Sequence, residues 1–267
     1  MIETKNILSF FHTMGLDWAY GGVLRNRFDE KEQPPPQLFT PPQNSSVQQP
    51  SLTSDSLMPR KKTVLASLHH PANACQSLEE LRHAVENFEG CDLKLGAKNT
   101  VFCDGNVDAK IMLVGEAPGA DEDLQGKPFV GMSGQLLDKM MSAIGLDRGM
   151  VYISNIIPWR PPGNRPPSTQ EIAACLPFIE RHIYLKKPEF LLLLGGVATK
   201  AILNNNAGIM RLRGQWHTYT PPCAEDGFPS IQTLPTFHPA FLLRSPNQKV
   251  YAWEDLKMLK AAVDKGE

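Results

Sequence analysis

The sequence predicts an α/β protein of three layers, in which a central, mainly parallel four-stranded sheet lies between two layers of helices. Short apolar runs alternate with segments of helical periodicity from about residue 66 to the end of the chain. These runs are apolar throughout, as in strands that are covered on both faces. A content of 42% hydrophobic and 21% charged residues is ordinary for a soluble protein with a sizeable core.

Capping signals and glycines delimit the individual elements. Ser77 with Glu80, and Ser168 with Glu171, have the spacing of a capping box, and Gly90 is expected to stop the first helix. In chain order the sequence predicts helix 77–90, strand 109–115, helix 133–145 capped by Ser133, strand 150–156, helix 168–187, strand 189–196, helix 197–204, strand 231–239 and helix 251–265.

The first 65 residues differ in composition from the rest of the chain. Residues 1–25 carry apolar side chains at roughly helical spacing and predict a short helical segment. Residues 26–65 are rich in Pro, Gln and Ser, and they predict a disordered linker because they bury too little surface to offset the entropy of ordering. Residues 66–267 form the predicted folded domain. The segment 1–25 is either a helix that docks a protein partner or a simple tail.

Charge and cysteine usage narrow the class of protein. The formal net charge of −1 requires any surface that binds nucleic acid to be local. Five scattered cysteines without a CxxC pair argue against a disulfide framework and indicate a reducing cytoplasm. The first residues lack the features of a signal or transit peptide, and the apolar run from Phe190 is too short to span a bilayer. We therefore expect a cytoplasmic protein without membrane contact.

The unusual residues lie where the predicted strands end, and ligands of parallel sheets bind at the carboxyl ends of the strands. Residues 115–131 follow the first strand with two glycines and a proline in a sharp turn, three consecutive acidic residues and then Phe129. Alone, this segment is either a ligand-binding turn or a solvated acidic turn. It has no GK[ST] ending, which disfavours a phosphate-binding loop.

Two further strand ends carry polar side chains. Asn155 ends the second strand and His238 follows the fourth, and each alone has an ordinary structural explanation. Residues 241–244 then form an apolar tip that ends in Arg244. Such a tip suits a protein that inserts side chains into a DNA duplex while it holds phosphates, and a buried strand-to-helix connection explains it equally well.

Three segments carry a resemblance to a known family. They read "GEAPGADEDLQGKPFVGMSGQLL", "VYISNIIPWRPPGNRPP" and "HPAFLLR". Their order and spacing are similar to those of the family-four uracil-DNA glycosylases, from about Cys91 to the last helix, some two-thirds of the chain. The resemblance implies that residues 66–267 are a catalytic domain that flips uracil out of DNA and hydrolyses its N-glycosidic bond, leaving an abasic site. It also implies a base excision repair enzyme, which we expect to be a monomer in the bacterial cytosol or nucleoid.

The resemblance assigns roles around the base. Phe129 is implied to stack on uracil, Asn155 to pair with its O4 and N3 edge, and His238 to donate to O2 as negative charge develops there. Ala117 is implied to border the base, at a position where some members of the superfamily have an aspartate.

Water activation and DNA contacts follow from the same resemblance. Glu116 or Glu122 is implied to orient the attacking water, and the alternative is that attack on a cation-like sugar needs little help from a base. Glu122 is also a candidate for excluding the methyl group of thymine. DNA contacts are implied for Arg160, Asn164 and Arg165 in the loop after the second strand, and for Leu242, Leu243 and Arg244 in an intercalating loop.

The family normally binds a [4Fe–4S] cluster through four cysteines. The corresponding positions here are Cys91, Lys94, Trp159 and Cys175, and two thiolates cannot hold such a cluster. We therefore expect no cofactor, with Trp159 filling the volume of the cluster. The alternative is that Trp159 lies on the surface of a reorganised loop.

Three other functions compete with an active glycosylase. One is a DNA-binding relative that has lost catalysis with its cluster, and the presence of Phe129, Asn155 and His238 argues against it. Another is a relative that traps the abasic product through a histidine, but the loop after the second strand contains no histidine. The third is a phosphate-loop nucleotide enzyme, which the missing lysine–serine ending disfavours.

Overall fold

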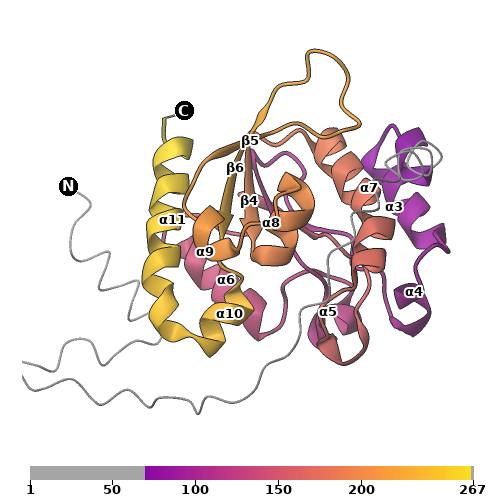
Figure 1. The fold of residues 1–267 in the computed structure, drawn as a ribbon, viewed down its shortest axis with the longest axis horizontal. Coiled ribbons are helices and arrows are strands. Elements are labelled where there is room, and N and C mark those ends of the chain that lie inside the picture. Colours follow the sequence, from indigo (N-terminus) through magenta and orange to yellow (C-terminus); the bar gives the residue numbers. More distant parts are fainter. Residues whose placement is uncertain (1–69, 266–267) are drawn as a thin grey trace, which may run out of the picture.

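A six-stranded sheet forms the centre of the molecule, in the order β1-β3-β2-β4-β6-β5 (Figure 1). The computed structural model describes residues 70–265, so the predicted segment 1–25 and linker 26–65 lie outside the described residues. The four inner strands are parallel and match the four predicted ones: β3 (Val151–Asn155), β2 (Ile111–Gly115), β4 (Phe190–Leu194) and β6 (Ile231–Thr236). The edge strands β1 (Asp104–Gly105) and β5 (His217–Tyr219) are antiparallel and were not predicted.

Helices cover both faces of this sheet, as predicted. They are α3 (Leu78–Asn87), α4 (Leu93–Gly96), α5 (Ala120–Gln125), α6 (Met132–Ser142), α7 (Thr169–Lys186), α8 (Gly196–Leu203), α9 (Ile209–Leu212), α10 (Pro239–Arg244) and α11 (Lys249–Val263), with the 3-10 helices η2 (Pro71–Ala74), η3 (Pro162–Asn164) and η4 (Pro246–Gln248). None of the helices within residues 70–265 is both long and apolar enough to cross a membrane.

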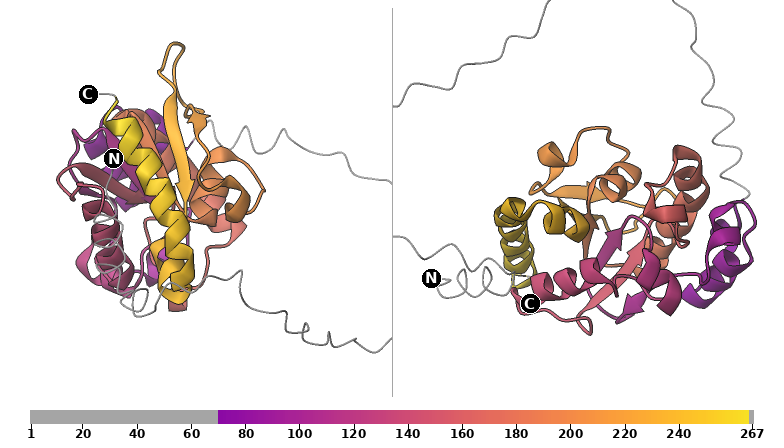
Figure 2. Two further views of the ribbon diagram at one scale, coloured as in Figure 1. Left: turned by 90° about the vertical axis from the view of Figure 1, so that its left-hand side faces the viewer. Right: turned by 90° about the horizontal axis from the view of Figure 1, so that it is seen from below.

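Two apolar cores lie on opposite faces of the sheet. Along β2, Met112 and Val114 belong to the core that includes side chains of α3 and α7, whereas Ile111 and Leu113 belong to the core that includes α6 and α11. Successive side chains of a strand point to opposite faces, so a strand between two helical layers must be apolar at every position. Figures 1 and 2 show these layers, with α3 and α7 on one side of the sheet and α6 and α11 on the other.

The capping signals place two long helices correctly. Ser168 Oγ accepts from the Glu171 N–H at 3.2 Å, and the Glu171 carboxylate accepts from the Ser168 N–H at 2.7 Å, which completes the predicted capping box of α7. Ser77 Oγ accepts from the Glu80 N–H at 3.1 Å, but the Glu80 carboxylate accepts from the N–H of Gln76, one residue earlier than predicted.

Two helix boundaries differ from the prediction. The N-cap of α6 is Gly131 rather than Ser133, because the distant carboxylate of Glu122 accepts from the Gly131 N–H at 2.8 Å and replaces a local cap. The first predicted helix ends at the C-cap Phe88, so Gly90 lies beyond the end of α3 and does not terminate it.

Ser168, which caps α7, and Ser133, which was predicted to cap α6 but does not, make a matched pair for a stability test. Ser168→Ala is expected to lower the free energy of unfolding by about 1 kcal/mol, because it leaves a helix N–H without its acceptor. Ser133→Ala, inside the first turn of α6 and not a cap, is expected to change it by less than about 0.5 kcal/mol. Urea denaturation of both variants measures the difference, and an equal loss in both would contradict this assignment of the caps.

Candidate active site

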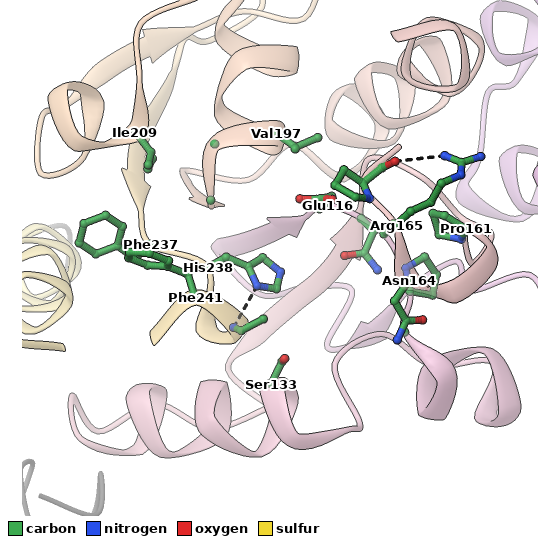
Figure 3. Close-up of a pocket in the computed structure, with 18 of the residues that line it drawn as sticks. Glu116, Ser133, Pro161, Asn164, Arg165, Val197, Ile209, Phe237, His238 and Phe241 are labelled. Atoms are coloured by element: carbon green, nitrogen blue, oxygen red, sulfur yellow. Dashed lines mark hydrogen bonds between the residues drawn. The ribbon is translucent and has the colours of Figure 1, made fainter. Parts of the chain in front are cut away.

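The carboxyl ends of the inner strands open into a cavity of about 720 Å³ (Figure 3). It brings together most of the residues predicted for the site: Glu116, Ala117, Glu122, Phe129, Asn155, Asn164, Arg165, His238 and Arg244. In Figure 3, Arg165 and Asn164 lie on one side of His238, and Ile209 and Phe241 lie on the other. The predicted residues Arg160, Leu242 and Leu243 are not part of its lining.

Phe129 forms an aromatic wall of the cavity. Its backbone has a φ of 55°, a left-handed conformation that is unfavourable for a bulky residue, and only 5% of its surface is exposed. The ring packs against the end of β2, where a Cβ on Gly115 would lie 2.5 Å from Phe129 Cζ and 2.5 Å from Asn155 Oδ1. Gly115 is therefore needed for the ring and the amide to share this space. From the sequence, the glycine was expected only to contribute to a sharp turn, and this packing role was not predicted.

Asn155 presents a buried acceptor without a partner. The side chain is 5% exposed at the end of β3, and its Oδ1 makes no hydrogen bond. A buried polar atom normally has a partner, because leaving one unpaired costs free energy. The residue borders the cavity, so an N–H group of a bound ligand can supply the missing donor.

His238 faces the same cavity as a neutral hydrogen-bond donor. It is the N-cap of α10, and its Nδ1 accepts from the Ala240 N–H at 3.1 Å, which leaves the ring proton on Nε2. Burial, with a smaller contribution from Arg244, lowers the pKa of His238 to about 4. Its ring centroid lies 5.6 Å from that of Phe129, so the donor and the aromatic wall are close enough to contact the same ligand.

The two candidate glutamates have different environments. Glu122 is 6% exposed, and its carboxylate accepts from the backbone N–H groups of Gly119, Val130 and Gly131 at 2.8–3.0 Å. These contacts give Glu122 a role in holding the backbone, and because the residue also lines the cavity, the water-orienting and thymine-excluding roles implied for it stay predictions. Glu116 lines the cavity, and burial raises the pKa of its carboxyl group, opposed by a smaller effect of Arg244.

The proline-rich loop after β3 is internally braced. Arg165 donates to both oxygens of Glu171 at 2.9 and 2.6 Å, which lowers the pKa of Glu171 to about 2. Arg160 Nε donates to Asn164 Oδ1 at 2.7 Å. These contacts and the prolines fix the position of the two arginines at low entropic cost. From the sequence alone, Glu171 was predicted only as a capping residue.

The predicted intercalating tip requires a correction. Leu242 has no exposed surface and packs in the core on the α6 and α11 face, so it cannot enter DNA in this conformation. Leu243 is 39% exposed and is the apolar side chain that this loop presents. The lining also includes residues that were not predicted, among them Lys200 on α8 and Ile209 on α9, because no motif in the sequence marks them.

The residues at the cluster positions do not fit an iron–sulfur cluster. Trp159 is 1% exposed, its Nε1 donates to Thr100 Oγ1 at 3.1 Å, and its ring lies parallel to that of Phe88. The surface alternative for Trp159 is thus wrong. Cys91 and Cys175 are buried in the same core, and the neighbouring Cys175 thiol lowers the pKa of the Cys91 thiol. Within residues 70–265, no group of three or more His, Cys, Asp or Glu side chains is placed to hold a metal ion.

An aromatic ring, an unpaired amide oxygen and a neutral imidazole around one cavity of an α/β protein suit a planar ligand that forms hydrogen bonds. Residues 102–257 match the model of the uracil DNA glycosylase superfamily, and the chain belongs to this superfamily.

Several relatives share most of the folded region. A Type-4 uracil-DNA glycosylase of Sulfurisphaera tokodaii is 38% identical over 189 residues, covering 69% of this chain and 84% of the relative. Proteins of the same name from Pyrobaculum aerophilum and Thermotoga maritima are 36% and 34% identical, and the matches cover 92% and 95% of their lengths. The family resemblance inferred from the sequence is confirmed.

The tautomer and pKa of His238 can be tested directly. Its ring is expected to stay neutral, with the proton on Nε2, until the pH falls to about 4. The unfolded chain takes up this proton near pH 6.5, so the contribution of the group to stability falls as the pH drops from 6.5 towards 4. A ¹⁵N NMR titration of the histidine side chains measures this pKa, and a midpoint at or above 6.5 would contradict the assignment.

Proposed function

We propose that the protein is a DNA repair enzyme that removes uracil from DNA by hydrolysing its N-glycosidic bond and leaves an abasic site. The observation that carries this proposal is the unpaired Oδ1 of Asn155, buried in a cavity beside Phe129 and His238. Family membership and the similarity to proteins named Type-4 uracil-DNA glycosylase support it.

The proposed base pairing explains a preference for uracil over cytosine. Uracil offers an N3–H donor to Asn155 Oδ1 and an O4 acceptor to its amide group. Cytosine has an acceptor at N3 and an amino donor at N4, so an amide kept in this orientation would place Oδ1 against the N3 lone pair and leave it without a donor. A site built to form a hydrogen bond strongly rejects an analogue that leaves a buried group unpaired. Phe129 supplies a face on which the flipped base stacks.

Bond cleavage is proposed to rest on the neutral imidazole. As the bond between C1′ and N1 breaks, its electron pair leaves with uracil, and the Nε2–H of His238 donates to O2, where negative charge accumulates. The sugar acquires cationic character. Water then adds to C1′ and loses a proton, and Glu116, which borders the cavity, is the group we propose to orient that water. The displaced uracil anion takes up a proton at N1.

DNA is proposed to lie across the mouth of the cavity. Arg165 and Asn164 line one side of it, and Arg244 is an exposed cation next to Leu243. Cations that contact phosphates give binding energy without reading sequence, and an exposed apolar side chain beside them can occupy the space that a flipped base vacates.

We also propose that the chain works without an iron–sulfur cluster. Trp159 occupies the interior with its N–H satisfied, and two cysteines remain of a four-cysteine ligand set. Burying an indole can replace the stabilisation that metal ligation would give, because a large aromatic side chain removes much apolar surface from water.

Glycosylase activity is the first test of this function. Purified protein is expected to release uracil from single-stranded or double-stranded uracil-containing oligonucleotides, revealed as alkali-labile sites. His238→Ala is expected to reduce the rate by roughly 10²–10³-fold through loss of one donor to the developing anion. Binding of uracil-containing DNA without release would favour the inactive relative, and a stable covalent adduct would favour the trapping branch.

The cofactor proposal has a separate test. Anaerobically purified protein is expected to be colourless, and iron chelators are expected to leave its melting temperature unchanged. Trp159→Ala is expected to lower the free energy of unfolding by roughly 3–5 kcal/mol, and Trp159→Phe, which keeps most of the volume, by much less. A brown preparation with about four irons per chain would overturn the proposal.

A further inference from the structure

The loop that carries Phe129 needs to be held in place. The residue follows α5 in a left-handed backbone conformation that its side chain disfavours, and such conformations persist only where the surroundings impose them. If the loop relaxed, the ring would leave the end of β2 and the aromatic wall of the cavity would be lost. The contacts that fix residues 128–131 are therefore part of the site, although several of them lie outside the cavity.

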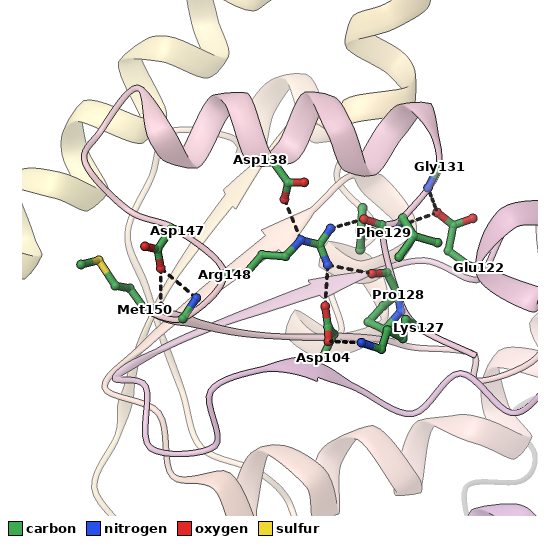
Figure 4. Close-up of polar contacts among 12 residues, drawn as sticks. Asp104, Glu122, Lys127, Pro128, Phe129, Gly131, Asp138, Asp147, Arg148 and Met150 are labelled. Carbon is green, nitrogen blue, oxygen red and sulfur yellow. Dashed lines mark hydrogen bonds and ion pairs between the residues drawn. The ribbon is translucent and has the colours of Figure 1, made fainter. Parts of the chain in front are cut away.

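Arg148 contacts the backbone carbonyl groups of this loop (Figure 4). It lies in the turn before β3, and it is not among the residues that line the cavity. Its Nη2 donates to the Phe129 carbonyl oxygen, and its Nη1 is 3.4 Å from the Pro128 carbonyl oxygen. The planar guanidinium spreads several donors in fixed directions, so it can hold two consecutive carbonyl groups at once.

Two carboxylates fix the guanidinium itself. Nη1 donates to Asp104 Oδ2 at 2.6 Å, and Nε donates to Asp138 Oδ1 at 2.8 Å. Asp104 is on the edge strand β1 and Asp138 is on α6, so the arginine connects three separate elements. Only 29% of the side chain of Arg148 is exposed, and charge-assisted bonds are strong where solvent is partly excluded.

The opposite side of the loop is fixed by other contacts. Glu122 accepts from the N–H groups of Val130 and Gly131. Gly134, in the first turn of α6, packs directly beneath Phe129: a Cβ there would lie 1.8 Å from the Phe129 carbonyl oxygen. The same carbonyl group that Arg148 binds thus also needs a glycine opposite it.

We propose that Arg148 is a positioning residue for base recognition, which sets the stacking face of Phe129 by holding the carbonyl groups of residues 128 and 129. This inference rests on the proposed function. Arg148 does not touch the base; it acts through Phe129. If it were only a structural ion pair, its removal would change stability without a selective effect on binding of uracil.

The test uses two variants that displace the same carbonyl group by opposite means. Arg148→Met removes the guanidinium that donates to the Phe129 carbonyl oxygen, and Gly134→Ala introduces a methyl group into the space of that oxygen. The matched controls are Arg82→Met, which removes a cation from the ring of Phe102, and Gly96→Ala, where an added Cβ meets no atom within 4 Å. All are full-length proteins, compared by melting temperature before any assay.

Three measurements separate positioning from folding. They are the inhibition constant of free uracil, the single-turnover rate on a uracil-containing single strand, and the affinity for an oligonucleotide with a tetrahydrofuran abasic analogue. Arg148→Met and Gly134→Ala are each expected to weaken uracil binding and to slow excision by about 10- to 100-fold, the range of one lost base–aromatic stack. Affinity for the abasic analogue is expected to stay within about two-fold, because no base is stacked there.

Arg148→Lys keeps the charge without the planar fork. Its uracil binding and excision rate are expected to lie between those of the wild type and of Arg148→Met.

The outcomes distinguish failure of the proposed function from failure of the positioning role of Arg148. Wild-type protein that does not release uracil overturns the proposed function itself. Active wild-type protein with unchanged uracil inhibition and excision in a folded Arg148→Met variant overturns the positioning role alone. If Arg148→Met fails to fold, Asp138→Asn and Asp104→Asn decide, because each removes one carboxylate that holds the guanidinium. Normal uracil binding in both overturns the proposal, and selective weakening in either supports it.

Discussion

The site depends on the missing side chain of Gly115. The parallel register pairs Gly115 with Asn155, so β2 and β3 end side by side and the amide projects next to a residue without a Cβ. The ring of Phe129 packs into the same space, and any side chain at this position would meet both groups at 2.5 Å. The aromatic wall and the amide are therefore brought together by the pairing of two strands. The loop around Phe129 then needs only local contacts to keep the ring against this glycine.

The central part of the fold was predictable because its signals are local. A strand covered on both faces is apolar at every position, and a capping box such as that of Ser168 and Glu171 lies within four residues. The edge strands were missed because two or three residues carry no such pattern. Ser133 was wrongly predicted as a cap for a related reason, since the group that binds the start of α6 is the distant Glu122.

The sequence identified most residues of the candidate site, but it did not reveal what several of them do. Strand ends and the family resemblance identify Phe129, Asn155 and His238, which the structure places around one cavity. The same approach could not show that Glu122 is occupied by backbone donors. Nor could it identify Arg148, whose partners Phe129 and Asp104 lie 19 and 44 residues away in the sequence. Such roles depend on tertiary contacts between elements that no short motif joins.

Trp159 anchors the loop whose arginines are proposed to contact DNA. It stands at the root of the loop that carries Arg160 and Arg165, and it is buried in the core on the α3 and α7 face, where Phe88 and Phe178 pack edge to face. A metal ligand at this position would anchor the loop by one strong bond. The indole anchors the loop by packing and by the hydrogen bond to Thr100. The prolines that follow Trp159 restrict the backbone of the rest of the loop. A loop held in this way keeps its arginines in place without a metal, so the two proposals, a chain without a cluster and a loop that contacts DNA, are physically compatible.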